Sequence, residues 1–441
     1  MSQFLNRKSL VKQGLALSVA ALMMTAANAA TDKEEIQKLR QEVEQLKSLI
    51  SQQQQVQQQQ QVQLQQVQSR PPVQTPAQAP TLAGLFSKNG ASVNLYGFVR
   101  ADAEYAFKGG DGIFNRPGAV DLNGVPNDKG VVNPNSDRFY ATAKTTRIGL
   151  DFKTPVQGAD VGGKVEIDFA GTNDGVRIRH AYLTYNNWLF GQTTSSFLST
   201  ETQPEMIDFG SPLGVGTFRT PMVRYSDKID ANTQYALGLE QGRSENQLPS
   251  ATAKISHKFN DKGLITARAL IQETRARLVD GEGKEYNDQS DFSWGVGLGA
   301  NYKLLDNKLI LNADYSHVKG DDKFLLFSDN LAYNSTSNGR DIDLIDFDAV
   351  TVGATYKFNP KWRSTLGYGA IFVDGAKASK NGQNKKIQQG WLNVLYNPVK
   401  PITFGAEYVY GERDALLTEG SSSKERTGRD SRLGLMAKYD F

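Results

Sequence analysis

The sequence predicts an all-β fold, a transmembrane antiparallel barrel of about 16 strands, behind an N-terminal periplasmic α-helical coiled-coil segment. Two observations predict the barrel. From residue 92 to residue 441 the chain divides into segments of about ten residues in which apolar and polar positions alternate, and short turns alternate with long polar loops. Only helices and closed barrels satisfy every backbone hydrogen bond in lipid. No later stretch has the run of about 18 apolar residues that a membrane helix needs.

The last segment shows the alternation most clearly. One face carries Leu433, Leu435, Ala437, Tyr439 and Phe441, and the other carries Arg432, Met436, Lys438 and Asp440. An apolar face that ends in aromatic residues suits lipid and its interface, while the charged face suits water. A half-buried strand of a soluble sandwich has the same pattern, so the barrel prediction depends on the repetition of the pattern along the chain.

The connections between segments alternate in length. Short turns such as Asp306-Asn307, Asn359-Pro360 and 397–400 separate long polar loops. The long loops are expected at 107–144, 193–220, 274–290, 320–346, 375–386 and 412–428. Outer-membrane barrels have short periplasmic turns and long external loops, so an even number of strands places both ends of the barrel in the periplasm.

Residues 1–29 are predicted to be an export signal. Arg7, Lys8 and Lys12 form a basic region, residues 14–24 an apolar region, and Ala27-Asn28-Ala29 a cleavage site of small residues. The apolar region is too short to span a membrane. The mature chain is therefore expected to begin near Ala30 and to be exported.

Residues 30–68 are predicted to be a periplasmic coiled coil, because apolar residues recur in heptads from Ile36 through Leu39, Val43 and Leu46 to Ile50. β-Branched residues at position a with leucine at d favour a two-stranded coil. Glutamines occupy the core positions farther along, so a disordered glutamine-rich tether is the alternative for 51–68. Four prolines mark 69–91 as a stiff linker.

Composition excludes several classes of function. The chain has 50 Lys+Arg and 47 Asp+Glu, and the signal carries three of the bases, so the mature chain is neutral (50 − 3 = 47) and no nucleic-acid partner is expected. The chain has no cysteine, so no thiolate site can form. It has only three histidines, too few to favour a histidine-built metal site. No cofactor is expected, and a passive channel rather than an enzyme is predicted.

Basic residues on water-facing strand positions are the candidate pore residues. The alternation places six of them in the lumen, and two more flank the end of the loop at 193–220. The eight are Arg100, Arg147, Lys164, Arg177, Arg179, Arg268, Arg219 and Arg224. Such residues attract anions, and a guanidinium fork matches a carboxylate. The alternative is a lumen of mixed charge with no preference, because acids such as Glu166 and Asp168 share the same faces.

Two other motifs have ordinary explanations. The alternating carboxylates of 341–348 resemble calcium ligands but lack the glycine and spacing of a helical calcium loop, which favours a solvated loop entering a strand. Gly295, Gly297 and Gly299 superficially resemble a nucleotide loop. They lie in an alternating segment with no helix after it, which predicts small lumen-facing residues.

Specific stretches resemble a known family. The first strand, Leu95-Tyr96-Gly97-Phe98-Val99, and the C-terminal end, Tyr439-Asp440-Phe441, resemble those of outer-membrane porins. The run Arg177-Ile178-Arg179-His180-Ala181-Tyr182 with Gly191-Gln192-Thr193-Thr194-Ser195-Ser196-Phe197 resembles the DcaP-like porins, as do residues between Pro204 and Tyr225. The resemblance covers nearly the whole mature chain.

The resemblance implies a homotrimer of sixteen-stranded barrels in the outer membrane of a Gram-negative bacterium. It also implies contact with lipid and lipopolysaccharide, recognition of Tyr439 and Phe441 by the barrel-assembly machinery, and passage of small anions such as dicarboxylates. A general non-selective porin is the alternative. A barrel hydrolase would need a serine near His180, such as Ser195 or Ser196, but no nucleophile motif supports it. An envelope tether through residues 31–80 is a further alternative.

The segment 193–220 is the third connection on the external side, because the short connection near 171–176 is the second. The resemblance also implies that this loop folds into the barrel and narrows it. Five apolar residues are expected to anchor it, namely Phe197, Met206, Phe209, Leu213 and Phe218, with glycines at 210, 214 and 216 for tight bends. Glu201, Glu205 and Asp208 are expected to face the arginines and create a transverse field. A loop lying on the outer surface is the alternative.

Overall fold

The computed structural model describes residues 91–441 apart from 211, 280–281, 283, 326–327 and 336–340. The expected signal peptide at 1–29, the coiled coil at 30–68 and all but the last residue of the linker at 69–91 lie outside the described residues.

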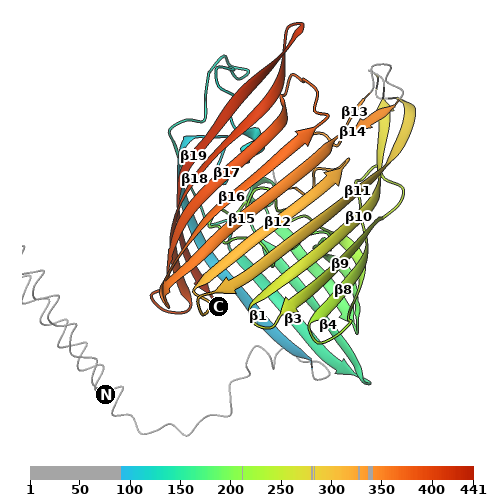
Figure 1. Cartoon of the computed structure of the whole chain (residues 1–441), viewed down its shortest axis with the longest axis vertical. Helices are drawn as coiled ribbons and strands as arrows, with labels where there is room; N and C mark the ends of the chain where they lie inside the picture. The colour runs from blue at the N-terminus through green and yellow to red at the C-terminus, as the bar shows by residue number, and fades with distance from the viewer. Residues whose placement is uncertain (1–90, 211, 280–281, 283, 326–327, 336–340) are drawn as a thin grey trace, which may run out of the picture. The chain divides into compact units, whose positions relative to one another are not determined.

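Strands make up most of the described chain and nearly all of its regular structure (Figure 1). The strands are β1 (Ser92–Lys108), β2 (Arg138–Thr142), β3 (Arg147–Val156), β4 (Ala159–Asp168), β5 (Arg177–Tyr185), β6 (Trp188–Thr194), β7 (Arg219–Lys228), β8 (Thr233–Glu240), β9 (Ser250–Phe259), β10 (Gly263–Val279), β11 (Glu285–Leu304), β12 (Leu309–Lys319), β13 (Tyr333–Ser335), β14 (Ile342–Leu344), β15 (Asp346–Asn359), β16 (Trp362–Asp374), β17 (Gln383–Tyr396), β18 (Ile402–Glu419) and β19 (Ser422–Asp440). Two short 3₁₀ turns, η2 (Pro117–Ala119) and η3 (Thr172–Asp174), lie in loops.

The strands form one closed antiparallel barrel. From β3 to β12 and from β15 to β19 each strand pairs with the next, and β12 pairs with β15 past the separate β13–β14 hairpin. β19 returns to pair with β1 from Phe98 to Lys108. β2 and β3 both pair with β1, on successive stretches of it, so they are two halves of one interrupted barrel strand. The 17-stranded sheet of the described residues is therefore a barrel of 16 strands, as the segment count predicted.

The barrel has an apolar exterior and a polar interior. On β19, Leu433, Leu435 and Tyr439 are exposed while Arg432 is buried in the lumen, which confirms the alternation expected for this strand. Aromatic pairs such as Trp362 with Tyr396 lie near the short turns, where a membrane interface is expected. Among the described residues, no helix is long and apolar enough to cross a membrane.

Several of the expected long loops are wrong. β10 and β11 continue through most of 274–290, and β18 and β19 continue through most of 412–428, so each pair is one long hairpin with a short turn. Charged residues interrupt the apolar alternation in these extensions, although the hydrogen-bonded ladder continues. Cross-strand ion pairs such as Arg426 with Glu419 join the two strands of a hairpin. The loop at 107–144 contains β2, and 320–346 contains the β13–β14 hairpin.

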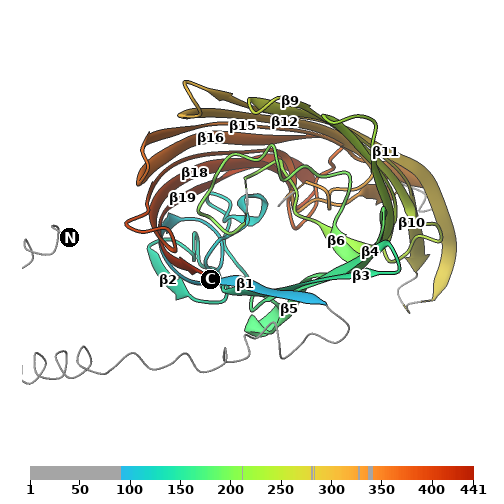
Figure 2. The same ribbon diagram turned by 90° about the horizontal axis from the view of Figure 1, so that it is seen from below.

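Part of the lumen is filled by an apolar core. Phe197 and Leu213, from the segment between β6 and β7, pack with Phe324 of the β12–β13 connection and with wall residues such as Phe347 and Ile371. Figure 2, which views the barrel from below, shows the β6–β7 segment crossing its interior. The loop at 193–220 is therefore inside the barrel rather than on its outer surface.

Candidate functional site

Glycines on the luminal wall make room for the β6–β7 loop. A Cβ atom added at Gly369 would lie 2.2 Å from the carbonyl oxygen of Leu213, one at Gly353 would lie 2.4 Å from Pro204, and one at Gly405 would lie 2.5 Å from Ile207. Gly295 and Gly299 likewise face Phe197 and Thr202. The loop therefore lies directly against β11, β15, β16 and β18, and the prediction of small lumen-facing glycines in 295–299 is confirmed.

Polar contacts attach the same loop around the barrel wall. The hydroxyl of Thr202 donates to Asp314 of β12 at 2.7 Å, and that of Thr351 on β15 donates to the Leu213 carbonyl at 2.5 Å. The indole nitrogen of Trp391 on β17 donates to the Glu205 carbonyl at 3.1 Å. These contacts to β12, β15 and β17 hold the loop in one position across the lumen.

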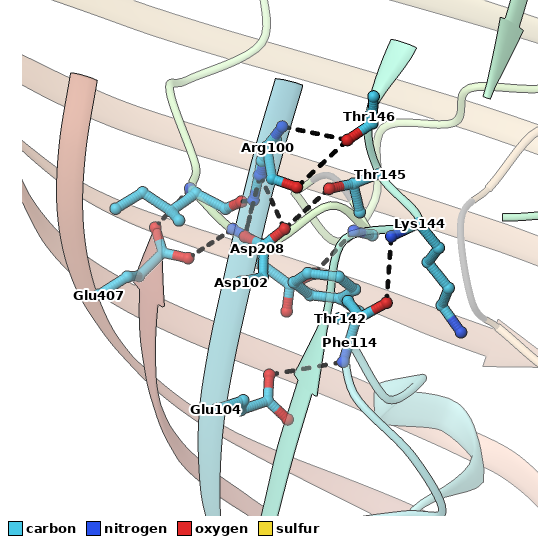
Figure 3. A network of polar contacts seen from close by, with 12 residues as sticks. Arg100, Asp102, Glu104, Phe114, Thr142, Lys144, Thr145, Thr146, Asp208 and Glu407 are labelled. Atoms are coloured by element: carbon cyan, nitrogen blue, oxygen red, sulfur yellow. Dashed lines mark hydrogen bonds and ion pairs between the residues drawn. The ribbon is translucent and has the colours of Figure 1, made fainter. Parts of the chain in front are cut away.

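The loop tip is clamped between β18 and β1, the strands on either side of the last strand, β19 (Figure 3). Both carboxylate oxygens of Glu407 on β18 accept backbone N–H groups, from Ile207 and Asp208, each at 2.8 Å. From the other side, the guanidinium of Arg100 on β1 donates to the Ile207 carbonyl and to Asp102. Arg100 is thus a clamp for the loop, with its charge compensated by Asp102 at 2.7 Å.

Four cations gather on the wall near this tip. Arg147, Arg177 and Arg219 are the first residues of β3, β5 and β7, and Arg179 lies two positions into β5. A bulge in the β4–β5 register, where Ile167 faces Ile178 but Glu166 faces His180, leaves Arg179 as the extra residue. The bulge allows Arg179 and His180 to be directed to the same side, which strict alternation would prevent. We call Arg147, Arg177, Arg179 and Arg219 the arginine cluster.

Two carboxylates partly neutralise the arginine cluster. Arg177 binds Asp168 with two parallel hydrogen bonds of 2.9 and 2.7 Å. Arg179 bridges Asp168 at 2.7 Å and Glu166 at 3.0 Å, and Arg147 lies 3.3 Å from Glu166. Four guanidinium groups against two carboxylates leave a net charge of +2 (4 − 2) with neutral histidine.

The loop approaches the arginine cluster with an aromatic ring. The ring centroid of Phe209 lies 5.6 Å from the Arg179 guanidinium, 6.0 Å from that of Arg177 and 5.9 Å from that of Arg100. Phe209 is only partly buried, so it forms one side of the space beside these cations rather than an anchor in the wall. Phe197, Leu213 and Phe218 do pack into the core as expected for anchors, whereas Met206 is not part of it.

Arg219 and Arg224 differ from the other predicted pore cations because neither makes an ion pair or hydrogen bond within the part of the chain that the structure describes. Arg219 lies within electrostatic range of the other three members of the arginine cluster. Arg224 lies near Tyr182, Glu201 and Glu240. Their charges are therefore available to a solute.

Arg268 and Lys164 have protein partners. Arg268 binds Asp314 at 2.7 and 2.9 Å, and the two side chains are 1% and 2% exposed. This buried pair fixes the wall beneath the loop and leaves Arg268 without contact with water. Lys164 lies 3.2 Å from Asp151 and 4.6 Å from the ring centroid of Tyr96. The expectation that Arg268 presents its charge to the lumen is therefore contradicted.

The three acidic residues of the loop bind cations of the barrel wall outside the arginine cluster. Glu201 binds Lys254 of β9 at 3.0 Å, Glu205 binds Arg363 of β16 with two bonds of 2.7 and 2.8 Å, and Asp208 binds Arg432 of β19 at 2.6 Å. Each carboxylate is thus neutralised by a wall cation. The expected transverse field between these acids and the arginines is weakened accordingly.

The ion pair of Glu201 also sets its protonation. Partial burial tends to raise the pKa of Glu201, but the charge and hydrogen bonds of Lys254 outweigh it, so the pKa lies below the usual glutamate value. Because the pKa is lowered in the folded state, the ion pair stabilises the loop at pH values above the usual pKa of glutamate. This stabilisation is lost as the pH falls through the lowered pKa.

Four functional side chains were missed by the sequence argument. Arg363, Arg432 and Lys254 bind the loop acids, and Glu407 binds the loop backbone. Their water-facing positions in the alternation placed them in the lumen. Only the three-dimensional course of the loop identifies them as its partners.

The C-terminal residue closes the barrel. The backbone N–H of Phe441 donates to Gly97 O at 3.0 Å, and the Gly97 N–H donates back to Phe441 O at 3.1 Å. Tyr439 and Phe441 are both exposed on the outer face. Their side chains are thus available to lipid or to another protein, as an assembly signal requires.

The structure also bears on the weaker motifs. His180 binds Thr193 at 2.9 Å and lies 3.8 Å from Glu166, and it makes no hydrogen bond to Ser195 or Ser196. The acidic run 341–348 forms β14 and enters β15, with Asp343 paired to Lys377 and Asp348 to His317. Within the described residues, no group of three or more His, Asp or Glu side chains is arranged to hold a metal ion.

A closed 16-stranded barrel with an internal loop and a charged lumen defines an outer-membrane channel of the porin class. The family model of the DcaP outer membrane protein matches residues 17–441. The chain belongs to this family, and the barrel places it in the outer membrane of a Gram-negative bacterium. It is a channel protein rather than an enzyme.

Solved structures support this assignment. The outer membrane channel DcaP of Acinetobacter baumannii is 44% identical, with a TM-score of 0.70, over 80% of this chain and 99% of that chain. OmpT of Vibrio cholerae is 15% identical with a TM-score of 0.52, over 81% and 99% of the two chains. An anion-selective porin from Comamonas acidovorans is 13% identical with a TM-score of 0.52, over 80% and 100%. The last two show the fold alone. Comparison with curated proteins found no match.

Proposed function

We propose that this porin passes small hydrophilic solutes by passive diffusion and prefers anions, dicarboxylates among them. The observation that carries the proposal is the arginine cluster, with a net charge of +2 beside the loop that crosses the lumen. Arg219 has no protein partner within the described residues, and the other members share only two carboxylates. Positive charge in a low-dielectric passage concentrates anions there.

The contact between the loop and the arginine cluster supports a narrow passage at this point. The ring centroid of Phe209 lies 5.6 Å from the Arg179 guanidinium and 6.0 Å from that of Arg177, so the loop reaches the cluster and a solute must pass beside this contact. A planar guanidinium can bind a carboxylate with two hydrogen bonds, so a solute with two carboxylates can contact two arginines at once. This geometry favours dicarboxylates over monovalent inorganic anions.

The assembly and topology are proposed with the function. The porin acts as a homotrimer in contact with outer-membrane lipid and lipopolysaccharide, after recognition of its C-terminal strand by the barrel-assembly machinery. Residues 30–68 form the periplasmic coiled coil. One OmpT structure with this fold was described in a trimer form, and it is 17% identical.

The test is the reversal potential of the channel in a planar bilayer under a potassium chloride gradient. Replacing Arg177 and Arg179 together by glutamine lowers the net charge of the cluster from +2 to 0, so we expect the anion preference to fall towards neutrality. An unchanged reversal potential would remove these residues from the site.

A second recording tests the solute. Succinate added to the wild-type channel is expected to interrupt the current in a concentration-dependent way, because bound solute occupies the passage. Uninterrupted current at every succinate concentration would leave a general diffusion porin.

A further inference from the structure

A polar cavity lies on the luminal wall away from the arginine cluster. It has a volume of about 400 Å³ and is lined by Arg224, Ser226 and Lys228 of β7, by Lys254 and Ser256 of β9, and by Glu201 of the internal loop. We call this cavity the alcove. Arg224, Ser226 and Lys228 alternate with Val223 and Tyr225, which line the outer apolar groove, so the alcove opens to the lumen.

The alcove and the arginine cluster lie at opposite ends of β7. Arg219 is the first residue of the strand and Lys228 is the last, and Asn187 of the β5–β6 turn also lines the alcove. Short turns are periplasmic in outer-membrane barrels. Arg224 is five residues from Arg219, about 16 Å along the strand. A solute leaving the arginine cluster towards the periplasm therefore passes the alcove.

Small residues create the space. In the β7–β8–β9 register, Ala236 lies between Ser226 on one side and Lys254 on the other. Because Ala236 has only a methyl group, it leaves the space between the long side chains of Arg224 and Lys254 open. These two cations are on strands two positions apart, about 10 Å laterally, and long side chains can converge on one small ligand from that separation.

The charge of the alcove is positive. Arg224, Lys228 and Lys254 line the alcove together with Glu201 and Asp227, which gives +1 (3 − 2). Lys254 is held by Glu201 at 3.0 Å. Arg224 has no ion pair or hydrogen bond in the described part of the chain, although all the other lining residues except Ala236 have polar side chains. An unpaired guanidinium fork in a walled polar cavity is suited to a carboxylate.

We propose that the alcove is a second anion-binding site, at which a small dicarboxylate binds Arg224 with one carboxylate and Lys254 with the other before it enters the periplasm. The ligand class rests on the proposed function. The site itself rests on the alcove geometry. Two sites in series divide the path from the arginine cluster to the periplasm into shorter steps, so a bound solute leaves the cluster more readily.

The absence of native cysteine allows a direct test. Ala236→Cys places a single thiol on the alcove floor, and its rate of modification by the uncharged reagent methyl methanethiosulfonate is measured with and without succinate. At succinate ten times above its dissociation constant we expect modification to slow about tenfold, by mass action. Ser256→Cys, on the neighbouring strand, is the second reporter and is expected to show the same protection.

Arg224 variants test the assignment in both cysteine backgrounds. Arg224→Gln is expected to abolish protection by succinate, and Arg224→Lys to restore part of it because charge returns without the fork. Lys303→Gln is the matched control, since it removes one charge from the luminal face of β11 near the short-turn end and outside the alcove. Protection that is absent in the wild-type background at both cysteines, or that persists in Arg224→Gln, would overturn the second site.

The same variants separate this inference from the proposed function. Arg177→Gln with Arg179→Gln should change the reversal potential but leave succinate protection at Ala236→Cys intact. If the wild-type channel has no anion preference yet Arg224 is needed for protection, the proposed function fails and the alcove site stands. If the preference is present and protection is not, only the alcove site fails.

Discussion

The guanidinium of Arg432 on the last strand donates a 2.6 Å hydrogen bond to Asp208 at the tip of the internal loop, 224 residues earlier in the chain. Asp430 and Glu104 also contact this guanidinium, and all four side chains are buried. One contact thus joins the loop that crosses the lumen to the strand that closes the barrel. The position of the loop and the closure of the barrel are therefore coupled.

Arg432→Met is expected to destabilise the barrel strongly. It leaves the carboxylates of Asp208, Asp430 and Glu104 buried without their cation, which costs about 3–5 kcal/mol. The unfolding temperature, followed by the shift of the folded band in gel electrophoresis, should fall. Arg429→Met is the control, because its ion pair with Glu412 is exposed and is worth about 0–1 kcal/mol. Equal effects of the two variants would contradict the buried role of Arg432.

Arg268→Gln should separate stability from selectivity. Arg268 is enclosed with Asp314, so its loss should lower the unfolding temperature while the reversal potential changes little. Arg177→Gln should do the opposite, since its side chain is 37% exposed to the lumen. Both quantities are measured on each variant. A large selectivity change in Arg268→Gln would show that its charge reaches the solute.

Gly369→Ala should displace the internal loop. The added methyl group would lie 2.2 Å from the Leu213 carbonyl, so either the loop or the wall must move, at a cost of about 1–3 kcal/mol. We expect a larger single-channel conductance and more current noise. Gly390→Ala is the matched control in the neighbouring strand, where the nearest atom is 3.7 Å away. Unaltered conductance in Gly369→Ala would mean that the loop does not limit the current.

Arg363→Gln should reduce the anion preference although Arg363 is outside the arginine cluster. Its loss frees the carboxylate of Glu205, which is otherwise bound by two hydrogen bonds, and adds a net negative charge to the lumen. The double variant with Glu205→Gln removes that charge and should restore the wild-type reversal potential. Failure of the second substitution to restore it would assign the effect to loop movement instead.

The barrel was predictable because its physics is local. The alternation on β19, from Arg432 to Tyr439, arises because lipid lies on one side of the strand and water on the other. Every membrane strand meets the same two environments, so each one shows the pattern in its own sequence. The extensions of β10–β11 and β18–β19 escaped prediction because charged residues such as Arg413, Asp414 and Arg426 interrupt the apolar alternation there. The hydrogen-bonded ladder continues through them, and the sequence pattern does not show it.

The candidate site was predictable only in part. Arg147, Arg177, Arg179 and Arg219 do come together, and alternation indicated that strand cations face the lumen. The pairing of Glu201, Glu205 and Asp208 could not be inferred, because each partner lies on a strand distant in sequence. The bulge at Arg179 could not be predicted either, because one extra residue in a strand does not change the composition of the segment.

The sequence by itself thus determined the strand number, the two faces of the wall and the supply of luminal cations. Only the tertiary structure decided which cations keep an available charge. Arg268 is enclosed by Asp314, whereas Arg219 and Arg224 have no ion pair among the described residues. The physical reason is that alternation depends on the solvent at each face. The effective charge of a luminal side chain depends on the distance to carboxylates that the folded loop and the neighbouring strands bring to it.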